Sequence, residues 1–182
     1  MAAVHLAGSL LAAMLLFDGC TGGGPHAAGS LDLPASVKDT LPAISSLPSP
    51  DGKVASDIDH DLLKSPPVIQ SAAGVEYTSG RLELTPPDAQ TMAYAVFGAS
   101  LSPADGSIFP VKLSLDSDAQ YWVAVSNYSK QRWDFIPHQS SGSYILSQGA
   151  GLIKTGTGAV YVALVAWQAP ALFNGAVLTT NG

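Results

Sequence analysis

The sequence predicts an all-β protein, an antiparallel β-sandwich of immunoglobulin or fibronectin type, in its C-terminal part. Three observations support this class. Beyond Gly74, apolar residues recur at every second position in short runs rich in Val, Tyr, Trp and Thr, which is the period of a half-buried strand. Clusters of Gly, Pro, Ser and Asp separate these runs, as turns do. No segment beyond residue 75 shows the 3.6-residue period of a helix.

These runs define nine expected strands between residues 75 and 182. We expect them at 75–77, 81–85, 91–97, 108–115, 120–128, 132–136, 143–146, 159–167 and 175–179. The pair at 120–128 and 132–136 is the best-defined hairpin, because large apolar residues alternate with Arg132 and Asp134 in its second strand. Asn174-Gly175 is expected to form the turn before the last strand.

The first residues have the pattern of an export signal. Residues 6–17 form an apolar run, which is shorter than the roughly 20 residues of a membrane-spanning helix but suits a signal-peptide core of about 7–15. A cluster of Gly and Pro at residues 22–25 prevents any helix from continuing. We therefore expect residues 1–19 to be a signal peptide.

Gly19-Cys20, followed by a Gly-rich stretch, resembles the processing site of bacterial lipoprotein precursors. In that family a small residue precedes a cysteine that is lipidated and becomes the new N-terminus. The resemblance implies lipidation of Cys20 and a place in the cell envelope or at the cell surface. Phe17 and Asp18 depart from the family's pattern. Ordinary signal cleavage, which would give a secreted protein, and an uncleaved N-terminal anchor remain open as alternatives.

The remaining chain divides into a tether and a domain. Residues 20–74 are expected to be a Pro-, Ser- and Gly-rich tether, because seven prolines between residues 25 and 70 leave room for neither a continuous helix nor an inner strand. Within it, residues 54–63 are expected either as a short helix or as a segment lying against the domain. Residues 75–182 are expected to be the β-sandwich, and a chain starting at Ser71 is expected to fold alone. Its hairpin at residues 121–135 resembles one in secreted bacterial proteins, which implies no activity.

Charge and motifs argue against several classes of function. Eight basic and 14 acidic residues give a net charge of −6, which disfavours a nucleic-acid partner. The four histidines are scattered, and neither a Gly-x-Ser-x-Gly nor a His-Glu-x-x-His motif is present. The acidic run 57–61 has Leu62 where a calcium loop needs Gly. We therefore expect no catalytic residues, no metal site and no cofactor, with an unrecognised hydrolase as the least favoured alternative.

One sheet face is expected to be unusual. Small residues, among them Ala93, Ala95, Ala124 and Ala163, are expected on its outward side, where an exposed face normally carries Thr, Lys or Glu. Larger rings flank these positions: Trp122, Tyr128, Tyr161 and Trp167. Two interpretations remain open. Either another part of the chain, such as the Pro-rich segment, covers the face, or the rings form a platform for a glycan or a partner protein.

The sequence thus leads to one functional hypothesis and one alternative. The hypothesis is a non-enzymatic, membrane-tethered β-sandwich that presents an interaction surface outside the cytoplasm. The alternative is a carbohydrate-binding or adhesion module that uses the rim of aromatic rings.

Overall fold

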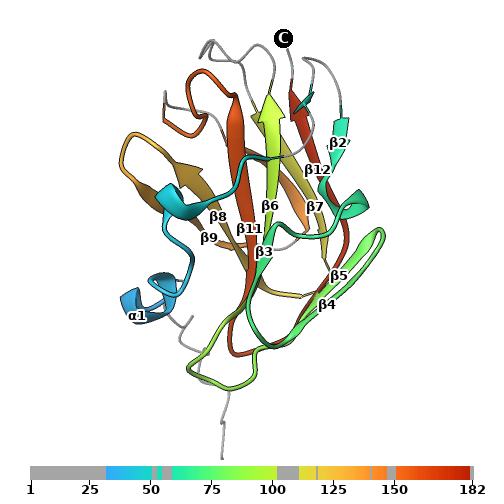
Figure 1. Ribbon diagram of the computed structural model, residues 1–182. Helices are drawn as coiled ribbons and strands as arrows, with labels where there is room; N and C mark the ends of the chain where they lie inside the picture. The colour runs from blue at the N-terminus through green and yellow to red at the C-terminus, as the bar shows by residue number, and fades with distance from the viewer. Residues whose placement is uncertain are drawn as a thin grey trace, which may run out of the picture.

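The computed structural model describes residues 32–50, 53–54, 59–101, 111–117, 119–139, 141–146 and 151–180. These residues form a sandwich of two sheets, each of six strands (Figure 1). The all-β sandwich that the sequence predicts is therefore confirmed. The expected signal peptide, residues 1–19, and Cys20 lie outside the described residues.

The first sheet is named here the β11 sheet, after its central strand. Its strands are β1 (Lys53–Val54), β3 (Ile69–Gln70), β6 (Ala93–Leu101), β8 (Tyr121–Asn127), β9 (Arg132–Gln139) and β11 (Ala159–Ala166). Their order is β1-β6-β11-β8-β9, and β3 pairs with a different part of β6 than β1 does. Only the pair of β1 and β6 is parallel among these described pairs.

The second sheet, the β12 sheet, packs against the first. Its strands are β2 (Asp59–Asp61), β4 (Val75–Thr78), β5 (Arg81–Leu84), β7 (Val111–Ser117), β10 (Gly142–Ile145) and β12 (Ala171–Thr180). Their order is β10-β7-β12-β5-β4, and β2 pairs with the far part of β12. Three helical turns accompany the sheets: α1 (Ala35–Lys38), η1 (Ile44–Ser46) and η2 (Leu62–Lys64).

Eight of these strands pair in a nested order along the chain. β8 pairs with β9, β7 with β10, β6 with β11 and β5 with β12, and every pair is antiparallel. One long hairpin folded into two packed sheets has this pairing, which is the arrangement of a jelly roll. The expected immunoglobulin or fibronectin type is corrected by this order, since those sandwiches arrange their strands as ABED and CFG. The spacing of the apolar runs gives the number of strands, but it does not show which strands pair with one another.

The nine strands expected from the sequence are confirmed as β4 to β12, with one difference in the last. β12 begins at Ala171 and passes through Asn174 and Gly175, so the turn expected there is wrong. The pairing of β12 with β7 instead shifts register between Phe173 and Gly175. A β-bulge accommodates the extra residue within the strand, which is a position where Gly is common.

Large apolar side chains fill the space between the two sheets. Tyr121 from β8 and Phe173 from β12 are both fully buried, with ring centroids 4.9 Å apart in an edge-to-face arrangement. The other large members of this inner core come from both sheets: Leu82, Leu84, Phe97, Leu101, Leu113, Val123, Leu164 and Leu178. The alternating burial that predicts the strands therefore does build a core between the sheets.

The side chains of β6 point to the opposite faces from those that the sequence predicts. The sequence predicts Ala93 and Ala95 on the outward side, but both belong to the inner core, and Val96 faces outward instead. Phe97 and Leu101 lie inward in the same alternation as the two alanines. Because both faces of β6 are largely buried, no charged residue marks an outward face, and the sequence pattern leaves the choice undetermined.

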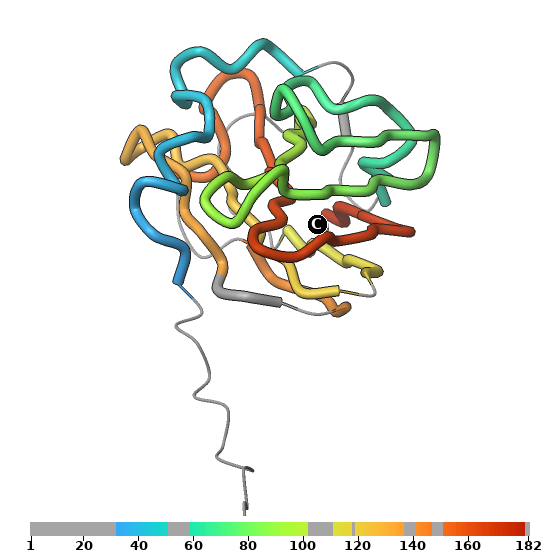
Figure 2. The backbone as a smooth tube through the Cα atoms, turned by 90° about the horizontal axis from the view of Figure 1, so that it is seen from below, coloured from blue at the N-terminus to red at the C-terminus, as the bar shows by residue number. Residues whose placement is uncertain are grey.

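A second apolar cluster lies on the outer face of the β11 sheet. Its sheet residues include Val96, Trp122, Ala124, Tyr161, Ala163 and Val165. The segment at residues 32–50, named here the cover segment, contributes the buried side chains Leu33, Val37 and Leu41 to this cluster, and its Ile44 is buried as well. It runs across this sheet in Figure 1, and Figure 2 shows it on the side away from β12. Part of the Pro-rich segment thus covers the face, as one of the two interpretations expected.

Close packing fixes the cover segment at two places. The Trp133 indole Nε1–H donates a hydrogen bond of 2.8 Å to the Pro42 carbonyl. Gly98 lies opposite Tyr161 in the sheet, and a Cβ on Gly98 would approach the Tyr161 ring to 2.6 Å and Pro50 to 3.0 Å. The missing side chain of Gly98 therefore makes room for the ring beneath the cover segment.

The range 20–74, expected to be a tether, contributes to the folded sandwich. Residues 32–50 cover the β11 sheet, β3 extends that sheet, and β2 extends the β12 sheet. Proline excludes inner strands, but it leaves short edge strands and apolar side chains available for packing. Within the described part of the chain, no helix has the length and apolar character needed to cross a bilayer.

Candidate functional site

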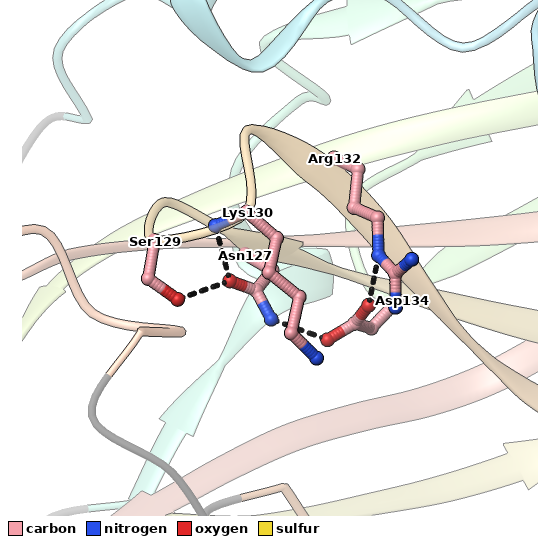
Figure 3. A network of polar contacts seen from close by, with 5 residues as sticks. All are labelled: Asn127, Ser129, Lys130, Arg132 and Asp134. Carbon is pink, nitrogen blue, oxygen red and sulfur yellow. Dashed lines mark hydrogen bonds and ion pairs between the residues drawn. The ribbon is translucent and has the colours of Figure 1, made fainter.

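The turn between β8 and β9 is held by a side chain as well as by the strand pairing. Asn127 and Arg132 are the last paired residues, so residues 128–131 make the turn. Asn127 Oδ1 accepts hydrogen bonds from Ser129 Oγ at 2.9 Å and from the Lys130 backbone N–H at 3.0 Å (Figure 3). Asn suits the start of a turn because its short side chain reaches the backbone N–H groups that follow.

The same network holds the carboxylate of Asp134, two residues into β9. Asn127 Nδ2 donates to one carboxylate oxygen, and Arg132 Nε donates to the other at 3.0 Å (Figure 3). Partial burial by itself would raise the pKa of Asp134. The hydrogen bonds from Asn127 and Arg132, together with the charges of Arg132 and Lys130, outweigh this and lower the pKa below its ordinary value. Asp134 is therefore a paired, ionised group at neutral pH.

Asp134→Asn should reduce the stability of the protein most at neutral pH. A carboxyl whose pKa falls on folding stabilises the native state above its ordinary pKa of 3.8, and this contribution is lost as the pH falls through the lowered value. We expect the variant to lose about 1 kcal/mol of unfolding free energy at pH 7, since the network is partly exposed. Urea unfolding at pH 7 and near pH 3 measures the difference, which should shrink in acid.

Asp116→Asn provides the matched control for this prediction, because Asp116 is an exposed carboxyl on β7. It should change the unfolding free energy by less than about 0.5 kcal/mol. An Asp134→Asn loss that is the same at both pH values would contradict the assigned role of the ionised carboxylate.

Gly151 supports the turn from the other side. The Tyr128 backbone N–H donates a hydrogen bond to the Gly151 carbonyl. A Cβ on Gly151 would overlap Ser129 Oγ and lie 3.1 Å from Asn127 Oδ1. Residue 151 therefore has to be small for the chain to pass this close to the turn. The shape of the turn is set by contacts from both its own hairpin and a distant segment.

Among the described residues, three grooves border this turn. One of about 340 Å³ lies between the turn, β9, Ile145 and Gly151. A second, of about 130 Å³, lies between the turn, residues 44–50 and Lys154. The third, of about 810 Å³, separates β9 from residues 38–44 of the cover segment. We name this part of the molecule the grooved end. Concave surfaces that combine apolar and polar side chains are the usual places where proteins bind ligands.

All four rings that the sequence singles out belong to, or pack against, the apolar cluster on the outer face of the β11 sheet. Trp122 and Tyr161 are 8% and 1% exposed, because the cover segment packs over them. Trp167 is half-buried, and its ring lies 6.0 Å from that of Trp122, edge to face. These three rings are part of the covered apolar cluster. A flat, open platform made of all four rings is therefore not formed.

Tyr128 and the buried Tyr161 are the two predicted rings that line a groove of the grooved end, and Tyr128 is the more exposed of the two. It lines the 130 Å³ groove together with Gln131 and Tyr161. Burial, with a smaller contribution from the nearby Tyr161, raises the pKa of the Tyr128 hydroxyl to about 12 despite the opposing effect of a hydrogen bond with Ser126, so it stays protonated at neutral pH. Its hydroxyl can donate as well as accept hydrogen bonds there.

Sequence reasoning missed most of the side chains at the grooved end. The sequence pattern places Lys130 in a turn and Arg132 in a strand, but it does not indicate that either residue belongs to a binding surface. Lys38 and Lys154 reach the same place from segments far away in the chain. The spacing of Leu33, Val37, Leu41 and Ile44 was a signal for the cover segment, because apolar residues three or four apart indicate a segment with one buried side.

The described residues gather no group of three or more His, Cys, Asp or Glu side chains that would hold a metal ion. The chemistry of the grooved end is hydrogen bonding, charge and ring contact. When the chain is compared with known proteins, neither a protein-family model nor a curated protein shows a significant match.

Proposed function

We propose that this chain is a non-enzymatic, membrane-tethered β-sandwich that presents an interaction surface outside the cytoplasm, and that this surface is the grooved end. One observation carries the proposal. Three grooves border a single turn, and the shape of that turn is held by hydrogen bonds from Asn127 and by contact with Gly151. A binding surface with its shape already set loses less conformational entropy on association.

The apolar face of the β11 sheet supports this choice of surface. Its buried residues pack against the cover segment and are unavailable to a partner while that segment stays in place. The grooved end, in contrast, includes exposed side chains, among them Ile145 at 65% exposed. An exposed large apolar side chain beside a groove is a common feature of interaction sites.

A specific observation favours the carbohydrate-binding or adhesion module as the second candidate. Tyr128, Trp133 and Phe135 are half-buried and line grooves of the grooved end. Aromatic rings with an apolar face and nearby polar groups suit contact with sugar rings. In this second candidate function, the rings that contact the sugar are therefore those of the β8–β9 hairpin instead of Trp122 and Trp167 on the covered sheet face.

The membrane tether rests on the resemblance of Gly19-Cys20 to lipoprotein processing sites. We expect metabolic labelling with palmitate to mark the wild-type protein and to be lost in Cys20→Ser, because the only cysteine supplies the attachment point. Two acyl chains on one residue would anchor the protein firmly, whereas one chain binds only marginally. Persistent labelling of the variant would exclude lipidation of Cys20.

Site-specific cross-linking tests the interaction surface. A photoactivatable phenylalanine analogue is placed at Ile145 or at Ala43, which line two different grooves, in the full chain expressed in its own cells. The matched control position is Glu76, which is exposed on β4 at the other edge of the β12 sheet from β10. We expect light-dependent adducts at the first two positions and none at Glu76. Equal adducts at all three, or none at any, would contradict the proposal.

A further inference from the structure

Positive charge gathers at the grooved end of an otherwise acidic chain. Four of the eight basic residues line its grooves: Lys38, Lys130, Arg132 and Lys154. Only two acidic residues, Asp39 and Asp134, line the same grooves. This end therefore carries a local excess of positive charge, although the whole chain has a net charge of −6. Such an asymmetry attracts anionic partners to one part of the surface.

The charges differ in how far they are already neutralised. Arg132 is paired with Asp134, and Lys38 lies 3.9 Å from Asp32 and over the ring of Phe135. Lys130 and Lys154 are both exposed, and neither forms an ion pair with a described residue. These two ammonium groups border the turn from two different grooves. An anionic ligand could pair with them without displacing an existing partner.

The surroundings of these charges distinguish among anionic partners. The grooves are concave and lined in part by the rings of Tyr128, Trp133 and Phe135, which suits a chain of sugar rings better than a flat bilayer. Gln131 and Ser45 add side-chain amide and hydroxyl groups to the same lining.

We infer that the grooved end binds an anionic polysaccharide, specifically a chain of uronic-acid sugars. Its carboxylates would pair with Lys130 and Lys154, and its ring faces would lie against the aromatic side chains of the grooves. This inference rests on the proposed function, since it names the ligand class of that same surface. Binding of this kind should weaken as salt is added, because the exposed lysines are screened.

Binding of polygalacturonate to the full chain tests the inference, with neutral dextran as the comparison polymer and titration calorimetry as the measurement. The test variant is Lys130→Glu with Lys154→Glu. We expect it to weaken binding at least about tenfold, since two charge-assisted contacts become repulsive. The matched control is Lys64→Glu with Arg81→Glu, which makes the same change in net charge at exposed sites outside the three grooves. It should change the affinity by less than about twofold.

Several results would overturn the inference. Equal weakening in both double variants would mean that overall charge alone controls binding, and equal affinity for dextran would mean that the carboxylates play no part. Binding to phosphatidylglycerol vesicles without binding to polygalacturonate would identify a lipid surface instead. Thermal melting of both variants confirms that they fold. If cross-links still form at Ile145 and Ala43 while polygalacturonate does not bind, the proposed function stands and only the ligand class fails.

Discussion

A chain that begins at Ser71 should aggregate, whereas a chain that begins at Asp32 should fold into a soluble sandwich. The shorter chain lacks the cover segment, so it exposes the outer apolar face of the β11 sheet, including Trp122, Tyr161 and Val165. It also lacks β2 and β3, which pair with β12 and β6. Large exposed apolar faces and newly open strand edges both promote association between chains.

The size of this effect follows from the buried side chains that are removed. Leu33, Val37, Leu41 and Ile44 are each less than 8% exposed. Burying such a side chain contributes about 1.5–3 kcal/mol, so their loss is large against a typical domain stability of about 5–15 kcal/mol. The sequence-based expectation that the part from Ser71 folds alone does not take account of this packing.

Size-exclusion chromatography and circular dichroism of the two purified chains measure the outcome. The chain from Asp32 should elute as a small species with a β-type spectrum and a cooperative thermal transition. The chain from Ser71 should elute in the void volume or bind the dye ANS strongly. A monomeric, cooperatively melting chain from Ser71 would show that the cover segment is dispensable.

Phe173→Ala should be the most destabilising single substitution among these tests, with an expected loss of about 3–5 kcal/mol of unfolding free energy. Phe173 is fully buried between the sheets and packs edge to face on Tyr121. Removing the ring leaves a cavity beside the bulge in β12, where the backbone is held by pairing with β7 on one side and β5 on the other. The surrounding strands cannot collapse into the space without losing those pairs.

Leu172→Ala is the matched control for this substitution. Leu172 is the preceding residue of β12, points to the opposite face and is only partly buried. Its truncation should lose about 1 kcal/mol or less. Urea unfolding of both variants measures the contrast. Equal losses in the two variants would contradict the assignment of Phe173 to the inner core.

The sequence predicted local structure well because local structure depends on nearby residues. Short apolar runs, separated by turn residues and alternating with polar residues in most cases, located the nine strands from β4 to β12. The hairpin of β8 and β9 was readable as well, since its two strands are close in the chain and joined by a short polar turn. The start of that turn at Asn127 follows from the same local chemistry.

The pairing of strands that lie far apart in the sequence could not be predicted in the same way. The nested order that joins β5 to β12 and β6 to β11 depends on which strands meet after the chain has turned several times. Every strand has the same period of two, so the period does not identify a partner. The immunoglobulin or fibronectin type was an inference from the spacing of short strands and the size of the domain, and several kinds of sandwich share these features.

The sequence by itself determined that this protein is a β-sandwich with one sheet whose second face is also apolar. Only the tertiary structure decided what covers that face, which side of β6 points inward, and that Lys38, Lys130 and Lys154 line three grooves around one turn. The physical reason is that alternation assigns side chains to two faces without saying which face is inner when both are buried. Surfaces assembled from distant segments, such as the grooved end, exist only once those segments pack.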